Sequence, residues 1–165
     1  CIAAAALFPE RVTALFLLAS VGVRRHRSIP ASAPVLASGA ALLGVPGLRS
    51  LLVFLMRRVY LRLGFRQAAE YDWRAFRTHL RVIAAVDFVR LAEHLARIDA
   101  PAVVAYAHDD PFVETDISED LAARLRRSTA LPFVTGGHYL QKTRVSEIGC
   151  AVAEKLVPQA PPAPS

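Results

Sequence analysis

Cysteine is scarce in this sequence, and its scarcity excludes two classes of small protein. Only Cys1 and Cys150 occur among 165 residues, at no paired spacing. Two isolated cysteines make neither a disulfide framework nor a zinc site, and we expect no metal and no cofactor. We interpret both as buried thiols in a reduced compartment, which favours a cytoplasmic location.

Acidic residues are scarce in one region, from Gly22 to Arg90. That region holds twelve arginines and three acidic residues, while the whole chain has a net charge of +6. Arginines on helices usually form a solvated face, and the alternatives are peripheral contact with an anionic membrane and steering of an anionic substrate. Nucleic acid is not an expected partner, because no recognition module occurs and no aromatic residues alternate with the basic ones as stacking platforms.

Long uninterrupted apolar runs are also missing. The longest uncharged stretch, Ser28 to Leu48, contains three prolines and three glycines, so we do not expect it to cross a membrane. The first residues, CIAAAALFPERV, lack the basic start and the apolar length of a signal peptide. Because Cys1 already lies in a predicted helix, we expect the chain to be a fragment of a longer protein.

The sequence does contain short apolar runs that alternate with helical segments. Continuous apolar runs of this length are typical of strands buried on both faces of a parallel sheet, so the predicted fold class is α/β. Strands are predicted at Val12–Ala19, Ala102–Ala107 and Leu131–Thr135. Helices are predicted at 1–8, 33–43, 48–63, from Asp72, at 88–98, 118–127 and 143–156, and residues 158–165 (PQAPPAPS) are predicted to be a disordered tail.

Proton-transferring residues follow two of these strands. Asp109 and Asp110 come after the strand ending at Ala107, and His138 follows Gly136 and Gly137 after the next strand. A carboxylate can hold an imidazole in one tautomer, and the imidazole can then act as a general base. We choose Asp110 as the acid and keep Asp109 as the alternative; a simple turn is the structural interpretation of both. His108 is interpreted as a turn residue, because no third metal ligand accompanies it.

These motifs resemble the α/β-hydrolase superfamily. The resemblance rests on AHDDPFV, with Ala107 where the family usually has glycine, on GGHYLQKTRVSEI, and on PERV followed by an apolar strand. It implies the C-terminal part of an α/β-hydrolase parallel sheet, at 1–21 and 99–157, with an inserted helical cap at 22–98. VGVRRHRSIP and VVAYAHDDPFVE are also similar, more weakly, to a hydrolase-like group of unknown function.

The family's nucleophile motif, Gly-x-Ser-x-Gly, does not occur in the chain. The resemblance therefore implies a serine-type hydrolase, esterase-like or lipase-like, that acts on a small apolar ester or acyl substrate. Asp110 and His138 would be its acid and base, the nucleophile would precede Cys1, and the fragment alone would be inactive. Two alternatives stay open: an epoxide-hydrolase-type enzyme with an aspartate nucleophile, and a non-catalytic scaffold that binds a ligand or partner.

Overall fold

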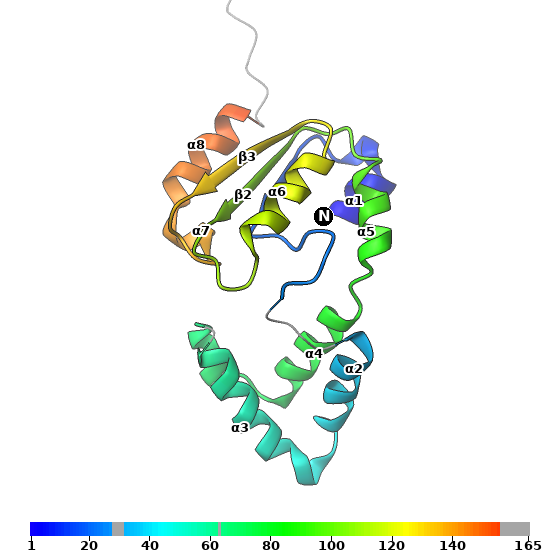
Figure 1. Ribbon diagram of the computed structural model, residues 1–165, viewed down its shortest axis with the longest axis vertical. Helices are drawn as coiled ribbons and strands as arrows, with labels where there is room; N and C mark the ends of the chain where they lie inside the picture. Colours follow the sequence, from blue (N-terminus) through cyan, green and yellow to red (C-terminus); the bar gives the residue numbers. More distant parts are fainter. Residues whose placement is uncertain (28–31, 63, 156–165) are drawn as a thin grey trace, which may run out of the picture. The chain divides into compact units, whose positions relative to one another are not determined.

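The computed structural model describes residues 1–27, 32–62 and 64–155, and the chain divides into two compact units (Figure 1). The sheet unit comprises Cys1–His26 and Phe88–Ser165, and the helical unit comprises Arg27–Asp87. The helical unit falls within the range 22–98 predicted for the cap, and its role as a cap stays a prediction. The predicted tail at 158–165 lies outside the described residues.

Three parallel strands form the sheet, in the order β1-β2-β3. They run Leu15–Leu18 (β1), Ala102–Ala107 (β2) and Ser128–Phe133 (β3). Every residue of the central strand β2 is buried, as expected for a parallel strand covered on both faces. Because all three strands are parallel, the loops that follow them meet at one edge of the sheet.

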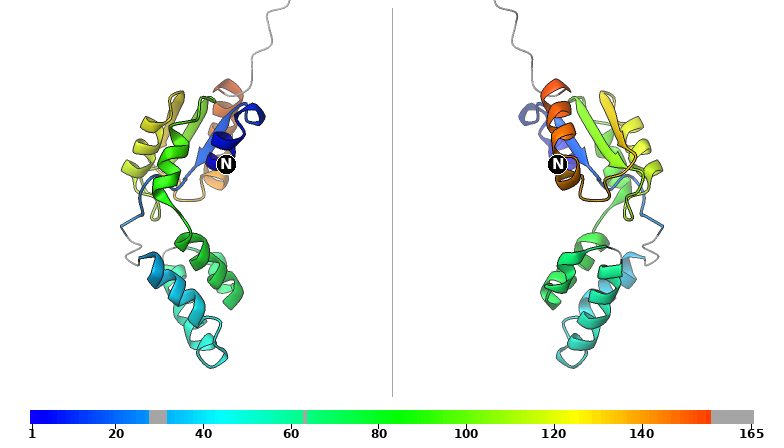
Figure 2. Two further views of the ribbon diagram at one scale, coloured as in Figure 1. Left: turned by 90° about the vertical axis from the view of Figure 1, so that its right-hand side faces the viewer. Right: turned by 90° about the vertical axis from the view of Figure 1, so that its left-hand side faces the viewer.

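Helices cover both faces of the sheet. They are α1 (Ile2–Leu7), α5 (Phe88–Leu95), α6 (Thr115–Arg124), α7 (Leu140–Thr143) and α8 (Val145–Lys155), with one 3₁₀ turn, η1 (Pro9–Arg11). The first three pack with Leu15 and Leu17, and the last two pack with Phe16 and Leu18. Successive strand residues point to opposite faces, so an entirely apolar strand supplies two cores. Figure 2 shows α6 and α8 on opposite sides of the strands.

Helix α5 belongs to the sheet unit, although it lies within the range predicted for the cap. Leu95 and the following Ile98 are fully buried in the core that also contains α1. The helical unit consists instead of α2 (Ala33–Leu42), α3 (Pro46–Arg62), η2 (Arg66–Ala69) and α4 (Trp73–Ala84). Its own core centres on Phe76, whose ring lies 5.2 Å from that of Tyr60.

Helix α4 begins where the sequence predicted. Asp72 is its N-cap, and the Asp72 Oδ1 accepts a hydrogen bond from the Ala75 backbone N–H at 2.9 Å. This bond satisfies one of the amides that a helix start leaves without an intrahelical partner. The hydrogen bond therefore fixes the start of α4 at Asp72.

The interpretation of the two cysteines as core thiols was wrong, because both are exposed. Cys1 precedes α1 as its N-cap residue. On α8 the side chains that meet the sheet are Ile148 and Val152, one turn apart. Cys150 lies midway between them in sequence and therefore on the opposite side of the helix. Within the described residues, no helix has both the length and the apolarity needed to cross a membrane.

Candidate active site

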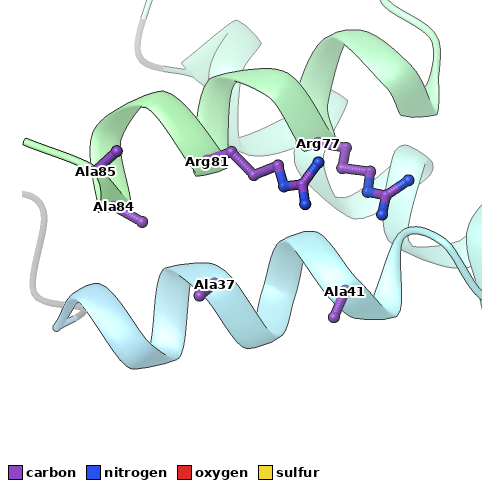
Figure 3. A pocket seen from close by; sticks show the side chains of 6 residues that line it. All are labelled: Ala37, Ala41, Arg77, Arg81, Ala84 and Ala85. Carbon is purple, nitrogen blue, oxygen red and sulfur yellow. The ribbon is translucent and has the colours of Figure 1, made fainter.

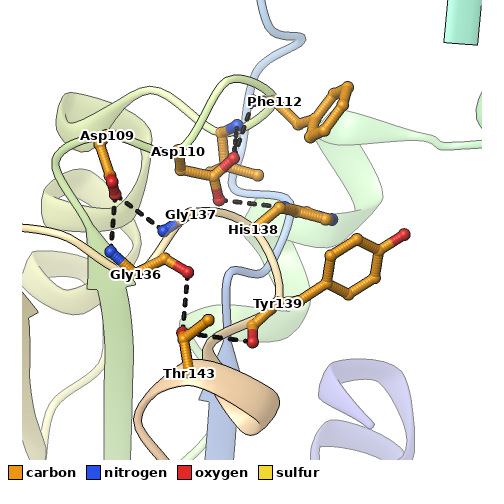
Figure 4. Close-up of polar contacts among 9 residues, drawn as sticks. Asp109, Asp110, Phe112, Gly136, Gly137, His138, Tyr139 and Thr143 are labelled. Atoms are coloured by element: carbon orange, nitrogen blue, oxygen red, sulfur yellow. Dashed lines mark hydrogen bonds and ion pairs between the residues drawn. The ribbon is translucent and has the colours of Figure 1, made fainter. Parts of the chain in front are cut away.

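Asp110 and His138 meet at the edge of the sheet where the strands end (Figure 4). The Nδ1 of His138 lies 3.0 Å from the Oδ2 of Asp110, although 28 residues separate them in sequence. The Asp110 side chain is 1% exposed and the His138 side chain 27% exposed. The pair thus has a buried carboxylate and an imidazole that solvent can reach.

Hydrogen bonds stabilise the buried carboxylate of Asp110. Its Oδ1 accepts from the backbone N–H of Phe112 at 2.7 Å and from that of Val113 at 3.1 Å, while Oδ2 faces the imidazole. A buried carboxylate is costly unless its oxygens are hydrogen-bonded, and here both oxygens have partners. The two backbone bonds fix the carboxylate, so that Oδ2 is directed at His138.

Asp109 has a different set of partners. Its Oδ1 accepts from the backbone N–H of Gly136 at 2.9 Å and from that of Gly137 at 2.8 Å. These amides belong to the turn that carries His138, so Asp109 ties the loop after β2 to the loop after β3. The sequence suggested Asp109 only as an alternative acid. It gave no signal for this contact, because the donors are backbone N–H groups, which every residue except proline has.

The turn before His138 requires both of its glycines. Gly137 has φ of +62°, a left-handed conformation that side chains disfavour. A Cβ on Gly136 would lie 2.5 Å from the Cδ2 of Leu140, too close without a shift of that side chain. Thr143 donates from Oγ1 to the Gly136 carbonyl at 2.8 Å and so closes the turn onto α7.

Two aromatic rings flank the imidazole of His138. The Phe112 ring centroid lies 5.0 Å away and the Tyr139 ring centroid 5.7 Å away, both edge to face. These are favourable separations and orientations for aromatic contacts. Together with the bond to Asp110, the rings restrict rotation of the imidazole.

Arg144 holds the loop from its other end. Its Nε donates to the Thr135 carbonyl at 2.9 Å, and one terminal nitrogen donates to the Thr135 Oγ1 at 2.8 Å. The other terminal nitrogen lies 3.2 Å from the Glu147 Oε1. The pKa of Glu147 is lowered, first by a backbone hydrogen bond at its own N–H and then by Arg144. The loop with His138 is thus held by side chains at both ends.

Arg24 lies in the segment after β1, and its neighbours decide whether its charge could face an anionic substrate. Arg24 forms ion pairs with Glu114 and Asp116, each at 2.6 Å. The hydrogen bond to Glu114 is the main cause that raises the pKa of Arg24, and Asp116 adds to it. These two carboxylates lie at the start of α6, in the same unit as Arg24, so they oppose its charge and tie the segment after β1 to α6.

The backbone conformation of two alanines at the strand ends, Ala107 and Ala19, bears on the site. Ala107 replaces the family's usual glycine without adopting positive φ, as its side chain requires. Ala19, at the end of β1, has φ of 42°, which costs a residue with a Cβ about 1–2 kcal/mol. Such strain tends to cluster at functional sites, and Ala19 lies at the same sheet edge as Asp110. Nothing in the sequence signalled it.

His108 lies next to the pair but has its own partner. Its Nδ1 is 3.2 Å from the Oγ1 of Thr115, in an exposed contact. This agrees with its interpretation as a turn residue. Within 1–27, 32–62 and 64–155, no group of three or more His, Cys, Asp or Glu residues could hold a metal ion.

Sequence comparisons found no matching family and no matching curated protein. Solved structures do resemble the chain. The enol-lactonase from Burkholderia xenovorans LB400 is 17% identical with a TM-score of 0.63, over 93% of this chain and 59% of that one. The meta-cleavage product hydrolase from Pseudomonas fluorescens IP01 is 18% identical with a TM-score of 0.58, over 93% and 58%. An esterase from Exiguobacterium antarcticum is 12% identical with a TM-score of 0.59, over 93% and 62%.

The resemblance covers nearly all of this chain and less than two thirds of each of those three. The parallel sheet with helices on both faces is the architecture that the sequence predicted. At identities below 20% the likeness concerns the fold and not the reaction. The chain has the α/β-hydrolase fold and corresponds to a part of it.

Proposed function

We propose that this chain supplies the acid and the base of a serine-type, esterase-like hydrolase. The observation that carries the proposal is the 3.0 Å contact between the Asp110 Oδ2 and the His138 Nδ1. A carboxylate at Nδ1 favours the tautomer with a proton on that nitrogen. The Nε2 is then the nitrogen that can accept a proton from a nucleophile.

The proposed roles follow from this arrangement. A serine hydroxyl from outside these 165 residues attacks the acyl carbon, and His138 takes its proton and later passes it to the leaving group. Asp110 keeps its negative charge and stabilises the imidazolium that forms. The assignment of Asp110, and not Asp109, rests on the contact of its buried side chain with the ring.

An apolar acyl substrate is proposed from the character of the helical unit. Helix α3 has no buried residue and exposes a wide apolar arc. Its exposed large hydrophobic residues are Leu48, Leu51, Phe54, Leu55, Val59 and Leu61. Exposed apolar surface of this extent is typical of a surface that meets another molecule.

The proposal is tested with the full-length protein and a series of p-nitrophenyl esters of increasing acyl length. We expect turnover to rise with acyl length over the short members, and a fluorophosphonate probe to label a serine. His138→Gln should lower kcat by about 10³-fold or more, since the general base is lost. His108→Gln is the matched control, because that exposed histidine follows β2, the strand before the one that His138 follows, and its ring nitrogen contacts Thr115 and not Asp110. Equal activity of the two variants would refute the roles proposed here.

Two other results would select the alternatives. Epoxide turnover without fluorophosphonate labelling would indicate an aspartate nucleophile. Glycine or alanine at the nucleophile position, with no turnover of any ester, would leave a binding scaffold. The 165-residue chain on its own should show no turnover above background, because no Gly-x-Ser-x-Gly sequence occurs in it.

A second candidate role, peripheral contact with an anionic membrane, is favoured by the mixed character of α3. Arg58 and Arg62 are exposed and, by helical geometry, share the arc of Leu55 and Val59. Basic and apolar residues on one exposed face favour anionic lipid surfaces. We expect co-sedimentation with phosphatidylserine vesicles that is lost in about 0.5 M salt, where the Debye length is roughly 4 Å. Equal binding to neutral vesicles, or no effect of salt, would rule this role out.

A further inference from the structure

The helical unit contains a surface cavity that belongs to neither proposal above. It lies between α2 and α4 and has a volume of about 440 Å³ (Figure 3). Its lining residues are Ala37, Ala41, Arg77, Arg81, Ala84 and Ala85. Four alanines and two arginines give short apolar walls with two cationic groups, and none of the described acidic residues lines the space.

The two arginines lie one helical turn apart on α4. Figure 3 shows the side chains of both arginines leaving α4 on the side that faces α2. The side chains of Arg77 and Arg81 make no hydrogen bond or ion pair within the described part of the chain, and the buried Nε of Arg77 has no partner there. Like charges four residues apart on a helix repel each other, so the arrangement costs stability unless an anion lies between them.

Acidic residues are few in the helical unit. Residues Arg27 to Asp87 include nine arginines and three acidic residues, and one of the three, Asp72, caps α4 and lies 3.9 Å from Arg74. Gly44, just after α2, lies beside Arg77: a Cβ there would be in ordinary contact with the Arg77 Cζ, at 3.9 Å. The charge of Arg77 is therefore close to the carboxyl end of α2, whose dipole tolerates a cation but does not replace a counter-ion.

We propose that this cavity binds a small organic carboxylate with a short aliphatic chain. The planar guanidinium groups of Arg77 and Arg81 would each donate to the carboxylate, a pairing that suits the fork geometry of arginine. The aliphatic part would lie on the methyl groups of Ala37, Ala41 and Ala84. The volume falls within the range of small-ligand pockets. A cavity lined by charge of a single sign also concentrates counter-ions from solution.

The test is a titration of the 165-residue chain with sodium butyrate, followed by backbone amide NMR, with butylamine and inorganic phosphate as comparison ligands. We expect saturable shifts at Ala37, Ala41 and Ala84 with butyrate and none with butylamine. Arg77→Gln and Arg81→Gln should each weaken binding by about tenfold or more, because each removes charge-assisted hydrogen bonds.

Arg74→Gln is the matched control. Arg74 lies on the same helix, but its guanidinium is 5.0 Å from the Trp73 ring and it contacts Asp72. Binding should be unchanged in this variant, and Arg81→Lys should bind at intermediate strength because it keeps the charge and loses the fork. Circular dichroism verifies that each variant is folded. Absence of saturable shifts, equal weakening by Arg74→Gln, or tighter binding of phosphate than of butyrate would each overturn the proposed site.

Discussion

Removing the carboxylate of Asp109 should loosen the turn that carries His138. The two bonds to Gly136 and Gly137 are 2.9 and 2.8 Å long and both are exposed. A hydrogen bond to a charged group contributes about 1.5–3 kcal/mol where it is buried, and less where water can replace it. We therefore expect Asp109→Ala to reduce the local stability of the turn by about 1–2 kcal/mol. That corresponds to a factor of roughly 5–30 in the opening equilibrium.

Amide hydrogen exchange measures this change directly. In Asp109→Ala, the amides of Gly136 and Gly137 should exchange about 5–30 times faster, while the amides of β2 keep their rates. Asp109→Asn keeps a carbonyl oxygen as acceptor, so it should show less than half of the effect in free energy. The Nδ1 proton signal of His138 should broaden in the alanine variant, because the imidazole is then held less firmly against Asp110.

Asp99→Ala is the control for loss of a surface carboxylate. Asp99 is paired with Arg126 at 3.0 Å, with both side chains largely exposed, so its removal should change stability by less than about 1 kcal/mol. It should leave the exchange of Gly136 and Gly137 unaltered. If Asp109→Ala also leaves it unaltered, or if Asp99→Ala accelerates it equally, then Asp109 does not hold the turn.

Three further predictions concern other parts of the molecule. Asp110→Asn keeps an oxygen for the two backbone amides, so unfolding by urea should shift by about 1–2 kcal/mol, while full-length activity should fall by about 10⁴-fold, since an amide favours the wrong histidine tautomer. Unchanged activity would refute the role of Asp110. Gly22→Ala should cost about 1–3 kcal/mol in the same urea assay, because the new Cβ would lie 2.6 Å from the Cγ2 and 2.9 Å from the carbonyl oxygen of Ile117. A neutral result would mean that this backbone contact relaxes freely. Burial raises the pKa of Tyr60 and of Tyr106. The folded state then keeps protons that the unfolded chain releases, so the contribution of these tyrosines to the free energy of unfolding should be constant below about pH 10 and should fall as pH rises further. Tyr106→Phe should remove part of that fall, and an unchanged alkaline slope would contradict the assignment.

The sequence predicted the central strand better than the outer two. β2 was expected at Ala102–Ala107 and lies there, because each of its residues is buried on a covered face. β3 was expected at Leu131–Thr135 and lies at Ser128–Phe133. Its pairing partner sets its start, since Ser128 is opposite Ala102. The register between two strands depends on both of them, so it cannot be predicted from the apolar pattern of one strand alone.

The candidate pair was also within reach of the sequence. Polar residues that follow parallel strands gather at one edge, so the strand pattern alone brought Asp110 near His138. The contacts that hold the pair in place were not predictable, because they involve backbone amides and the edges of aromatic rings. The strained φ of Ala19 was not predictable either. The interactions within the helical unit were equally hidden: the Arg57 side chain donates twice to the Tyr71 carbonyl, which no residue pattern indicates.

Asp109 and Asp110 are adjacent in sequence, but their carboxylates contact different groups. Consecutive side chains in a loop leave the backbone in different directions, so two neighbouring carboxylates rarely reach the same group. The buried side chain of Asp110 contacts the imidazole of His138 and two backbone amides of its own loop. The carboxylate of Asp109 is exposed and instead accepts hydrogen bonds from the glycine turn before His138. A carboxylate that must keep its charge beside an imidazolium needs fixed donors, and Asp110 has them. A carboxylate that only positions a backbone can remain in water, and for that role Asp109 needs no burial. The pair Asp109-Asp110 therefore combines loop fixation and ring orientation, and single substitutions should separate the two functions.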